Sequence, residues 1–109
     1  MGKQGRLTKD TITMIANRFR VLSDPMRLQI LHTLQGGEMS VMEIVAETDT
    51  SQPNVSKHLR LLQDAGLVLR RQQGNLVYYR VADESIFEMC DAVCDSLKRR
   101  AQNTVSFLP

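Results

Sequence analysis

The sequence predicts a single, mainly α-helical domain that contains one β-hairpin. Apolar residues recur at helical spacing in five segments, and one stretch between them changes to two extended runs separated by a Gly/Asn turn. The chain has 109 residues, of which 42% are hydrophobic, so it can bury one core without disulfides or metals. Trp is absent and aromatic residues make up only 5%, which predicts an aliphatic core.

The first two helices are separated by the sequence Ser23-Asp24-Pro25. The first helix ends near Leu22 and has an apolar stripe at helical spacing, made of Ile12, Ile15, Ala16, Phe19 and Leu22. Asp24 is the expected N-cap of the second helix, with Pro25 at its first position, where a missing N–H costs nothing. That helix runs to about Leu34, and Gly36 and Gly37 are expected to supply a left-handed C-terminal cap.

Two shorter helices follow. Ser40 and Glu43 have the spacing of a capping box, which opens a helix to about Glu47 with the apolar face Val41, Ile44 and Val45. After the turn Thr48-Asp49-Thr50, Ser51 caps another helix, which Gly66 closes. The apolar stripe of this helix consists of Val55, Leu59, Leu62 and, less certainly placed, Leu61.

The hairpin comprises residues 67–72 and 76–81, joined through Gln73-Gly74-Asn75. Asp83 is expected to cap a final helix. Its apolar stripe is longer than a small core needs and consists of Ile86, Phe87, Cys90, Val93, Cys94, Leu97 and Ala101. A second copy of the chain related by a two-fold axis would bury this stripe. The alternative is that residues 84–104 pack entirely on their own domain.

The expected organisation is a loose arm at 1–7, one domain at 8–104 and a tail at 105–109. No apolar stretch resembles a signal peptide or approaches the roughly 20 residues of a membrane span. We therefore expect a cytoplasmic protein without a membrane partner.

A short helix, a tight turn, a second helix and a basic hairpin follow one another in the order of a winged helix-turn-helix, which binds duplex DNA. The net charge is only +2, but residues 51–82 have five basic groups against one acidic group. The helix over 51–65 is the expected reading helix, the second helix of the motif, which enters the major groove of DNA. The candidate DNA-binding residues can donate to base edges or phosphates and are Ser51, Gln52, Asn54, Ser56, Lys57, His58, Arg60, Arg70 and Arg71. A merely solvated helix face and a charged hairpin edge are the alternatives.

Several of these features occur jointly in a known family. The matching features are Asp24-Pro25-x-Arg27, Ser51-Gln52 ahead of Val55-Ser56-x-His58-Leu59, Ala65-Gly66-Leu67-Val68 and Tyr78-Tyr79. Over residues 12 to 100 the chain resembles the ArsR/SmtB family of metal- and stress-responsive repressors. The resemblance implies a winged-helix homodimer, joined through its first and last helices, that releases a palindromic operator on sensing an effector.

The family's arsenic sensors have paired cysteines where this chain has Ser40-Val41-Met42, so that site is absent. The zinc-type sensors use Asp and His across the last helix, where this chain has no His. Cys90 and Cys94 share a helical face and are candidates for binding a soft metal or metalloid ion, or for oxidation. The alternative is that both thiols simply pack as small apolar groups.

The leading hypothesis is a transcriptional repressor whose affinity for DNA depends on an effector. A winged-helix module that docks a protein partner and does not bind DNA is the alternative. An enzyme is not expected, because two His and two Cys assemble no catalytic constellation and no Gly-rich phosphate loop is present.

Overall fold

The computed structural model describes residues 7–107, with side chains to residue 103. Its elements are α1 (Lys9–Leu22), α2 (Pro25–Thr33), the 3-10 helix η1 (Leu34–Gly36), β2 (Met39–Ser40), α3 (Val41–Glu47), α4 (Gln52–Asp64), β3 (Val68–Gln73), β4 (Leu76–Val81) and α5 (Ser85–Phe107). Residues 1–6 of the expected arm and 108–109 of the expected tail lie outside the described residues. The last helix continues to Phe107, beyond the expected domain end at 104.

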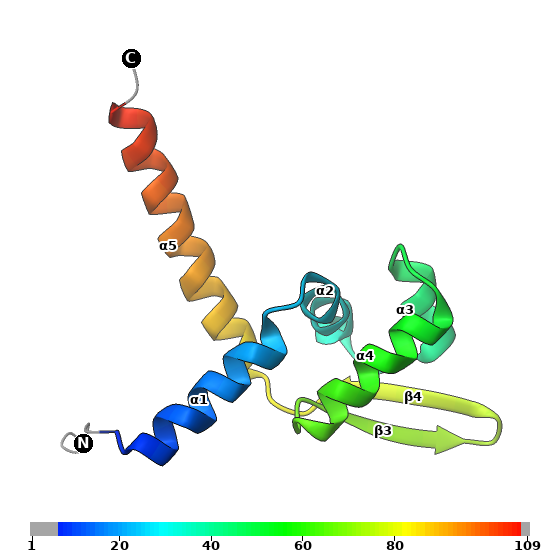
Figure 1. Ribbon diagram of the computed structural model, residues 1–109. Helices are drawn as coiled ribbons and strands as arrows, with labels where there is room; N and C mark the ends of the chain where they lie inside the picture. Colours follow the sequence, from blue (N-terminus) through cyan, green and yellow to red (C-terminus); the bar gives the residue numbers. More distant parts are fainter. Residues whose placement is uncertain (1–6, 108–109) are drawn as a thin grey trace.

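Helices α2, α3 and α4 form a cluster beside the hairpin, whereas α5 projects away from it (Figure 1). The radius of gyration is 17.1 Å, compared with about 13 Å for a compact domain of this length. The difference arises because most of α5 packs against nothing in its own chain. Among the described residues, no helix is both long enough and apolar enough to cross a membrane.

Side-chain caps begin the helices where the sequence indicated. Asp24 accepts hydrogen bonds from the backbone N–H groups of Met26 and Arg27 at 2.8 and 3.1 Å. Ser40 and Glu43 form the expected reciprocal capping box at the start of α3, and Ser51 caps α4. These caps confirm the predicted starts of the second, third and fourth helices.

The sheet has three strands in the order β2-β4-β3, all antiparallel. The hairpin was expected, but β2 was not, because its two residues are too few to give a periodic signal. β2 pairs Met39 with Tyr79 and Ser40 with Tyr78. Gly36 and Gly37 were both expected to supply a left-handed cap after α2, and this expectation is corrected. Of the two, only Gly37 has a positive φ, of 138°, whereas Gly36 belongs to η1.

The core is mainly aliphatic, as predicted, although Tyr79 and Phe87 are also buried in it, and it lies between α2, α3, α4, the sheet and the first turn of α5. Its fully buried side chains are Ile30, Leu31, Leu34, Ile44, Val55, Leu59, Leu62, Leu67, Val68 and Ile86. Leu61 is exposed on α4 and does not belong to the buried stripe.

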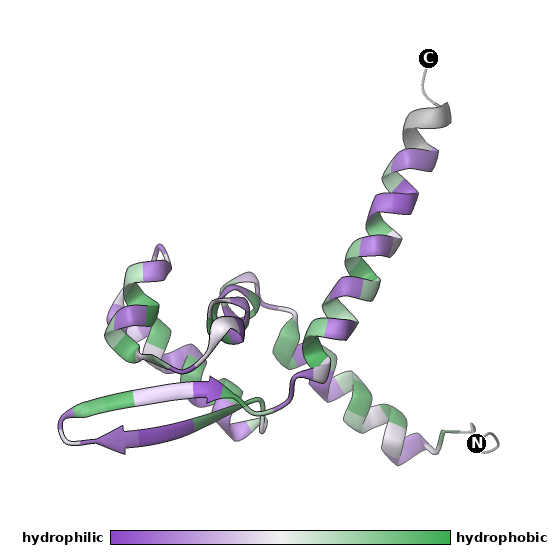
Figure 2. Ribbon diagram, turned by 180° about the vertical axis from the view of Figure 1, so that it is seen from behind, coloured by the Kyte–Doolittle hydropathy of each residue, from purple (hydrophilic) through white to green (hydrophobic). Residues whose placement is uncertain are grey.

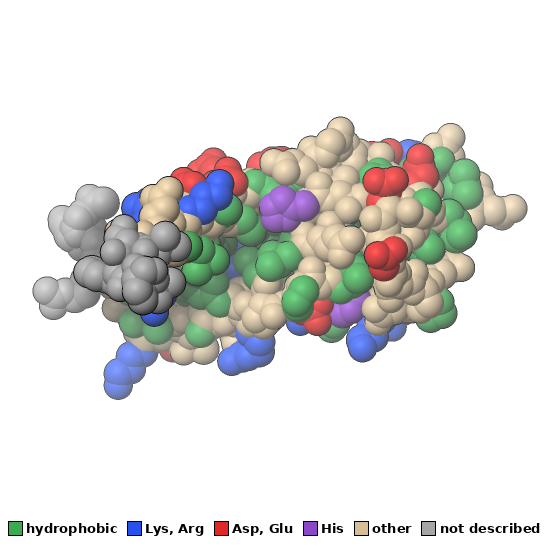
Figure 3. All heavy atoms as spheres, turned by 90° about the horizontal axis from the view of Figure 1, so that it is seen from above, with side chains coloured by type: hydrophobic (Ala, Val, Ile, Leu, Met, Phe, Trp, Pro, Cys, Tyr) green, Lys and Arg blue, Asp and Glu red, His purple; other side chains and the backbone are tan. Residues whose placement is uncertain are grey.

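Two helices keep apolar faces in solvent. On α5, Val93 and Leu97 are 51% and 60% exposed, and on α1, Phe19 is 52% exposed. Green bands recur along both helices in Figure 2. The view from above shows hydrophobic side chains reaching the surface on the left, where α1 and α5 lie (Figure 3). The alternative that residues 84–104 pack on their own domain is therefore wrong beyond the first turns of α5.

Candidate nucleic-acid interface

Helix α4 presents a mainly polar face to solvent because its apolar residues other than Leu61 turn inward. Val55, Leu59 and Leu62 are fully buried, whereas Gln52, Lys57 and Arg60 are exposed. Helix α3 packs across α4, and the buried Thr48 in the turn between them donates its hydroxyl to the carbonyl of Ile44 at 3.0 Å. The pair is thus a helix-turn-helix with α4 as its exposed second helix.

Two of the candidate DNA-binding residues at the start of α4, Ser51 and Asn54, also form hydrogen bonds within the chain. The hydroxyl of Ser51 accepts from the backbone N–H of Asn54 at 3.3 Å. The side-chain amide of Asn54 donates to the hydroxyl of Thr50 at 2.8 Å, and Asn54 is half-buried. Asn54 therefore retains one amide hydrogen and its carbonyl oxygen for DNA, fewer than the sequence suggested.

His58 is not at the surface of α4. Its side chain is only 6% exposed, and its Nδ1 atom is buried without a hydrogen-bond partner. The expectation that His58 contacts DNA is therefore corrected. The sequence spacing could have predicted this burial. His58 lies three residues after Val55 and four before Leu62, which places it on the inner face of the helix.

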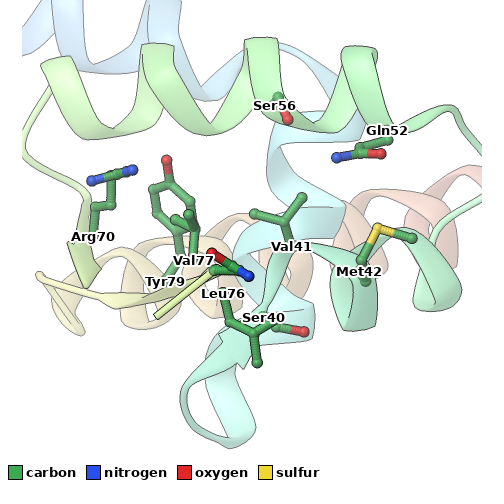
Figure 4. A pocket seen from close by; sticks show the side chains of 10 residues that line it. Ser40, Val41, Met42, Gln52, Ser56, Arg70, Leu76, Val77 and Tyr79 are labelled. Carbon is green, nitrogen blue, oxygen red and sulfur yellow. The ribbon is translucent and has the colours of Figure 1, made fainter. Parts of the chain in front are cut away.

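A groove of about 290 Å³ runs between α3, α4 and the hairpin (Figure 4). Gln52 and Ser56 line it from α4, and Arg70 lines it from β3. Arg70 lies opposite Tyr79 in the β3–β4 register, so both side chains are on the sheet face that points toward α4. The groove brings together three donors that the sequence proposed separately. Its apolar side includes Met42 and Val77, which were not proposed as site residues.

Arg71 lies on the opposite face of the hairpin from Arg70, because neighbouring residues in a strand alternate. Its guanidinium donates to both carboxylate oxygens of Glu38, from Nη2 at 2.7 Å and from Nε at 2.9 Å. This hydrogen-bonded pair lowers the pKa of the Glu38 carboxyl and raises the pKa of Arg71. The expectation that Arg71 binds DNA stays a prediction, and in this structure the Arg71 charge has a carboxylate partner within the chain.

The two cysteines lie on the projecting helix. Both are free thiols; Cys90 is half-buried and Cys94 is exposed. Burial, and to a smaller extent the charge of Asp91, raises the pKa of the Cys90 thiol. Within residues 7–103, no group of three or more His, Cys, Asp or Glu side chains could hold a metal ion in one chain. A metal site at these cysteines would need ligands from a second copy.

An apolar hollow beside α1 is a feature that sequence reasoning did not single out. Its apolar lining includes Met14, Ile15 and Phe19 from α1 and Met89 from α5. Arg18 and Asp83 form an ion pair with 3.2 Å between Nη1 and Oδ2, which ties α1 to the start of α5. Apolar side chains of both helices therefore line one hollow.

Comparison with known proteins agrees with this geometry. The family model described as bacterial regulatory protein, arsR family, matches residues 24–69. The HTH-type transcriptional regulator KmtR of Mycobacterium tuberculosis is 36% identical over 88 residues, which cover 80% of this chain and 68% of that protein. The arsenical resistance operon repressor of Escherichia coli is 43% identical over 65 residues, covering 59% of this chain and 56% of the relative.

Among solved structures, the homodimeric winged helix-turn-helix DNA-binding domain Mb0332 of Mycobacterium bovis, described as a possible ArsR-family regulator, superposes with a TM-score of 0.73. It is 30% identical in sequence, and the match covers 88% of this chain and 94% of the other. The helix order, the exposed α4 and the hairpin therefore correspond to a winged helix-turn-helix.

Proposed function

Since the chain belongs to the ArsR family of bacterial regulatory proteins, we propose that it represses transcription as a homodimer bound to a palindromic operator. The family membership confirms the sequence-based predictions of a winged helix-turn-helix fold and of a transcriptional regulator rather than an enzyme. We propose in addition that the operator is palindromic, that the chain forms a homodimer, and that the residues named below contact DNA.

The groove between α4 and the hairpin supports the proposed DNA contacts. Its donors Gln52, Ser56 and Arg70 come from both elements and share one side of the molecule. A helix in the major groove reads bases with amides and hydroxyls, whereas basic groups on its flanks bind phosphates. We assign phosphate contacts to Lys57, Arg60 and Arg70. Base or flanking contacts are assigned to Ser51, Gln52, Asn54 and Ser56.

The apolar surface of α1 and α5 supports the dimer. Phe19, Val93 and Leu97 are each more than half exposed, and clustered exposed apolar side chains of this kind mark interaction surfaces. A two-fold axis beside these helices would bury both copies of the surface and set two reading helices about one DNA turn apart. The homodimeric domain of Mycobacterium bovis is a precedent in a relative.

Selection of duplexes from a randomised pool, read by fluorescence anisotropy, tests the function directly. We expect enrichment of a palindrome. Lys57→Ala should weaken binding to all duplexes and reduce the salt slope by about one, whereas Gln52→Ala should relax preference at one position by about 1–3 kcal/mol. Lys98→Ala is the matched control, because it removes the same charge from α5 and should leave binding unchanged. Absence of DNA binding even at low salt would favour the protein-docking module.

A soft metal or metalloid ion at Cys90 and Cys94 is our proposal for the effector. The two thiols are four residues apart on α5, and a two-fold axis beside α5 would bring four thiols together. Each thiol loses its proton when the ion binds, so Cys90, with its raised pKa, should bind more tightly as the pH rises. One similar protein, from Escherichia coli, is named as the arsenical resistance operon repressor.

The test is release of operator DNA by arsenite and by Cd²⁺, measured for the wild type and for a Cys90→Ser, Cys94→Ser double variant. We expect release from the wild type and retention of DNA by the variant. Equal release from both proteins would assign the cysteines to packing. Release by peroxide, reversed by a thiol reductant, would assign them to oxidation instead.

A further inference from the structure

We propose that Glu38 positions the wing through Arg71, which leaves Arg70 as the arginine of β3 that contacts DNA. Here the wing is the hairpin of β3 and β4. The inference rests on the proposed DNA-binding function and assigns different roles to two adjacent arginines. Glu38, which lies outside the helix-turn-helix and the hairpin, becomes part of the DNA-binding machinery without touching DNA.

The contacts hold the Arg71 guanidinium on three sides. Two of its nitrogens donate to the two carboxylate oxygens of Glu38, at 2.7 and 2.9 Å. Its third nitrogen, Nη1, donates to the side-chain carbonyl of Gln73 at 2.7 Å. Its central carbon lies 4.7 Å from the centre of the Tyr78 ring, in the range of a cation–π contact. Three nitrogens of the guanidinium therefore already donate hydrogen bonds within the chain.

The Glu38–Arg71 ion pair lies where the third strand of the sheet ends. Ser40, Tyr78 and Arg71 form one row across the three strands, since Tyr78 is the register partner of both of the others. This row is the last one that β2 reaches. Beyond it, the hairpin extends to Gly74 as a two-stranded ribbon, which is weak on its own. The ion pair therefore ties β3 to the segment before β2 at the point where backbone support from the third strand ends.

Glu38 is an exposed residue whose backbone leads into the helix-turn-helix. It follows Gly37, whose φ of 138° favours glycine, and it leads through β2 directly into α3. A bond from Glu38 to β3 thus connects the wing to the first helix of the helix-turn-helix. The angle between the wing and the reading helix decides whether Arg70 and Gln52 can meet the same DNA. We infer that the Glu38–Arg71 pair fixes this angle.

Substitutions that change charge and geometry separately can distinguish a positioning role of Arg71 from direct contact of Arg71 with DNA. Lysine can replace an arginine that serves as a positive charge near phosphates, but it cannot make the two-pronged contact with a carboxylate. Glu38 next to a DNA-contacting Arg71 would oppose binding, so its removal would strengthen binding. If Glu38 positions the wing, its removal weakens binding. The two roles therefore predict opposite signs for one substitution.

The experiment measures affinity for the selected operator and its salt slope with the full chain. The variants are Arg71→Lys, Glu38→Gln, the charge-neutral double variant Glu38→Gln, Arg71→Gln, and the matched pair Arg70→Lys and Arg70→Gln. We expect the first three to weaken operator binding about three- to tenfold with an unchanged salt slope. Arg70→Lys keeps the positive charge and should lose less affinity than Arg71→Lys, whereas Arg70→Gln should weaken binding and lower the slope by about one.

Amide hydrogen exchange provides a second measurement on the same proteins without DNA. Exchange over residues 72–77 should accelerate in the three Glu38 and Arg71 variants and stay unchanged in both Arg70 variants. Wild-type affinity in Arg71→Lys, or tighter binding in Glu38→Gln, would overturn the positioning role. Failure of the wild type itself to bind any duplex would instead contradict the proposed function, and the two failures are therefore distinguishable.

Discussion

Truncating Leu97 to alanine should weaken the proposed dimer about 100-fold while leaving each protomer folded. Leu97 lies on the projecting part of α5 and is 60% exposed in the single chain. The substitution removes three carbons, each worth about 0.8 kcal/mol when fully buried. Burial of the exposed fraction therefore contributes about 1.4 kcal/mol per copy. A two-fold axis doubles this to about 3 kcal/mol of dimer free energy, or roughly two orders of magnitude in the dissociation constant.

Sedimentation velocity over a concentration series measures this change directly. Alanine has a higher helix propensity than leucine, so the circular dichroism of α5 should not fall. Leu76→Ala is the matched control, because Leu76 is 50% exposed at the end of the wing, away from α5, and should leave dimerisation unchanged. The reasoning would be refuted if Leu97→Ala dimerised as tightly as the wild type, or if Leu76→Ala were the variant that dissociated.

Three further predictions concern the fold that presents the site. Asp24→Ala should lower the free energy of unfolding by about 1 kcal/mol at pH 7, because it removes the cap of α2. Hydrogen bonds from the backbone N–H groups of Arg27 and Met26 lower the pKa of Asp24 from its ordinary value of 3.8, so this stabilisation is present above that pH. It is lost as the pH falls through the lowered pKa, and urea unfolding at pH 7 and pH 2.5 should show the difference between the two proteins shrinking. Gly66→Ala should cost about 1–2 kcal/mol, since Gly66 has a φ of 78° and an added Cβ would meet no other atom within 4 Å, which leaves backbone strain as the only cost. Gly36→Ala, at a glycine without a positive φ, should change thermal stability little, and an equal loss in both variants would contradict the backbone argument. Leu59→Ala should cost about 2–5 kcal/mol because Leu59 is fully buried, whereas Leu61→Ala should stay within about 0.5 kcal/mol. Comparable losses at both leucines in denaturant titrations would show that the core is not where the structure places it.

The helical elements could be predicted from the sequence because their signals are local. A cap such as Asp24 or Ser40 acts within three residues of itself, and an apolar stripe repeats within one helix. The polar face of α4 could be predicted for the same reason. Each of these features depends on neighbours in the sequence, which a single chain displays completely.

Two of the features that sequence reasoning missed, strand β2 and the partner of Arg71, depend on residues far away in the sequence. Strand β2 exists because Met39 and Ser40 pair with residues almost 40 positions later. Arg71 was indistinguishable from Arg70 in the sequence, because the partner that separates their roles, Glu38, lies 33 positions away. His58 is the exception: its spacing placed it inside, but its residue type was given more weight than its position.

The distribution of free charges, rather than the net charge, accounts for a DNA-binding surface in a chain of net charge +2. Residues 38–50 have four acidic groups and no basic ones, and they lead directly into the reading helix. Two of the four have partners within the chain: Glu38 binds Arg71, and Glu43 accepts the backbone N–H of Ser40 at 2.8 Å. A carboxylate held against a guanidinium or a helix N-terminus projects less negative potential toward a phosphate than a free one. Because the same bonds also fix α3 and the wing, acidic side chains close to the DNA-binding face help to arrange it instead of opposing it.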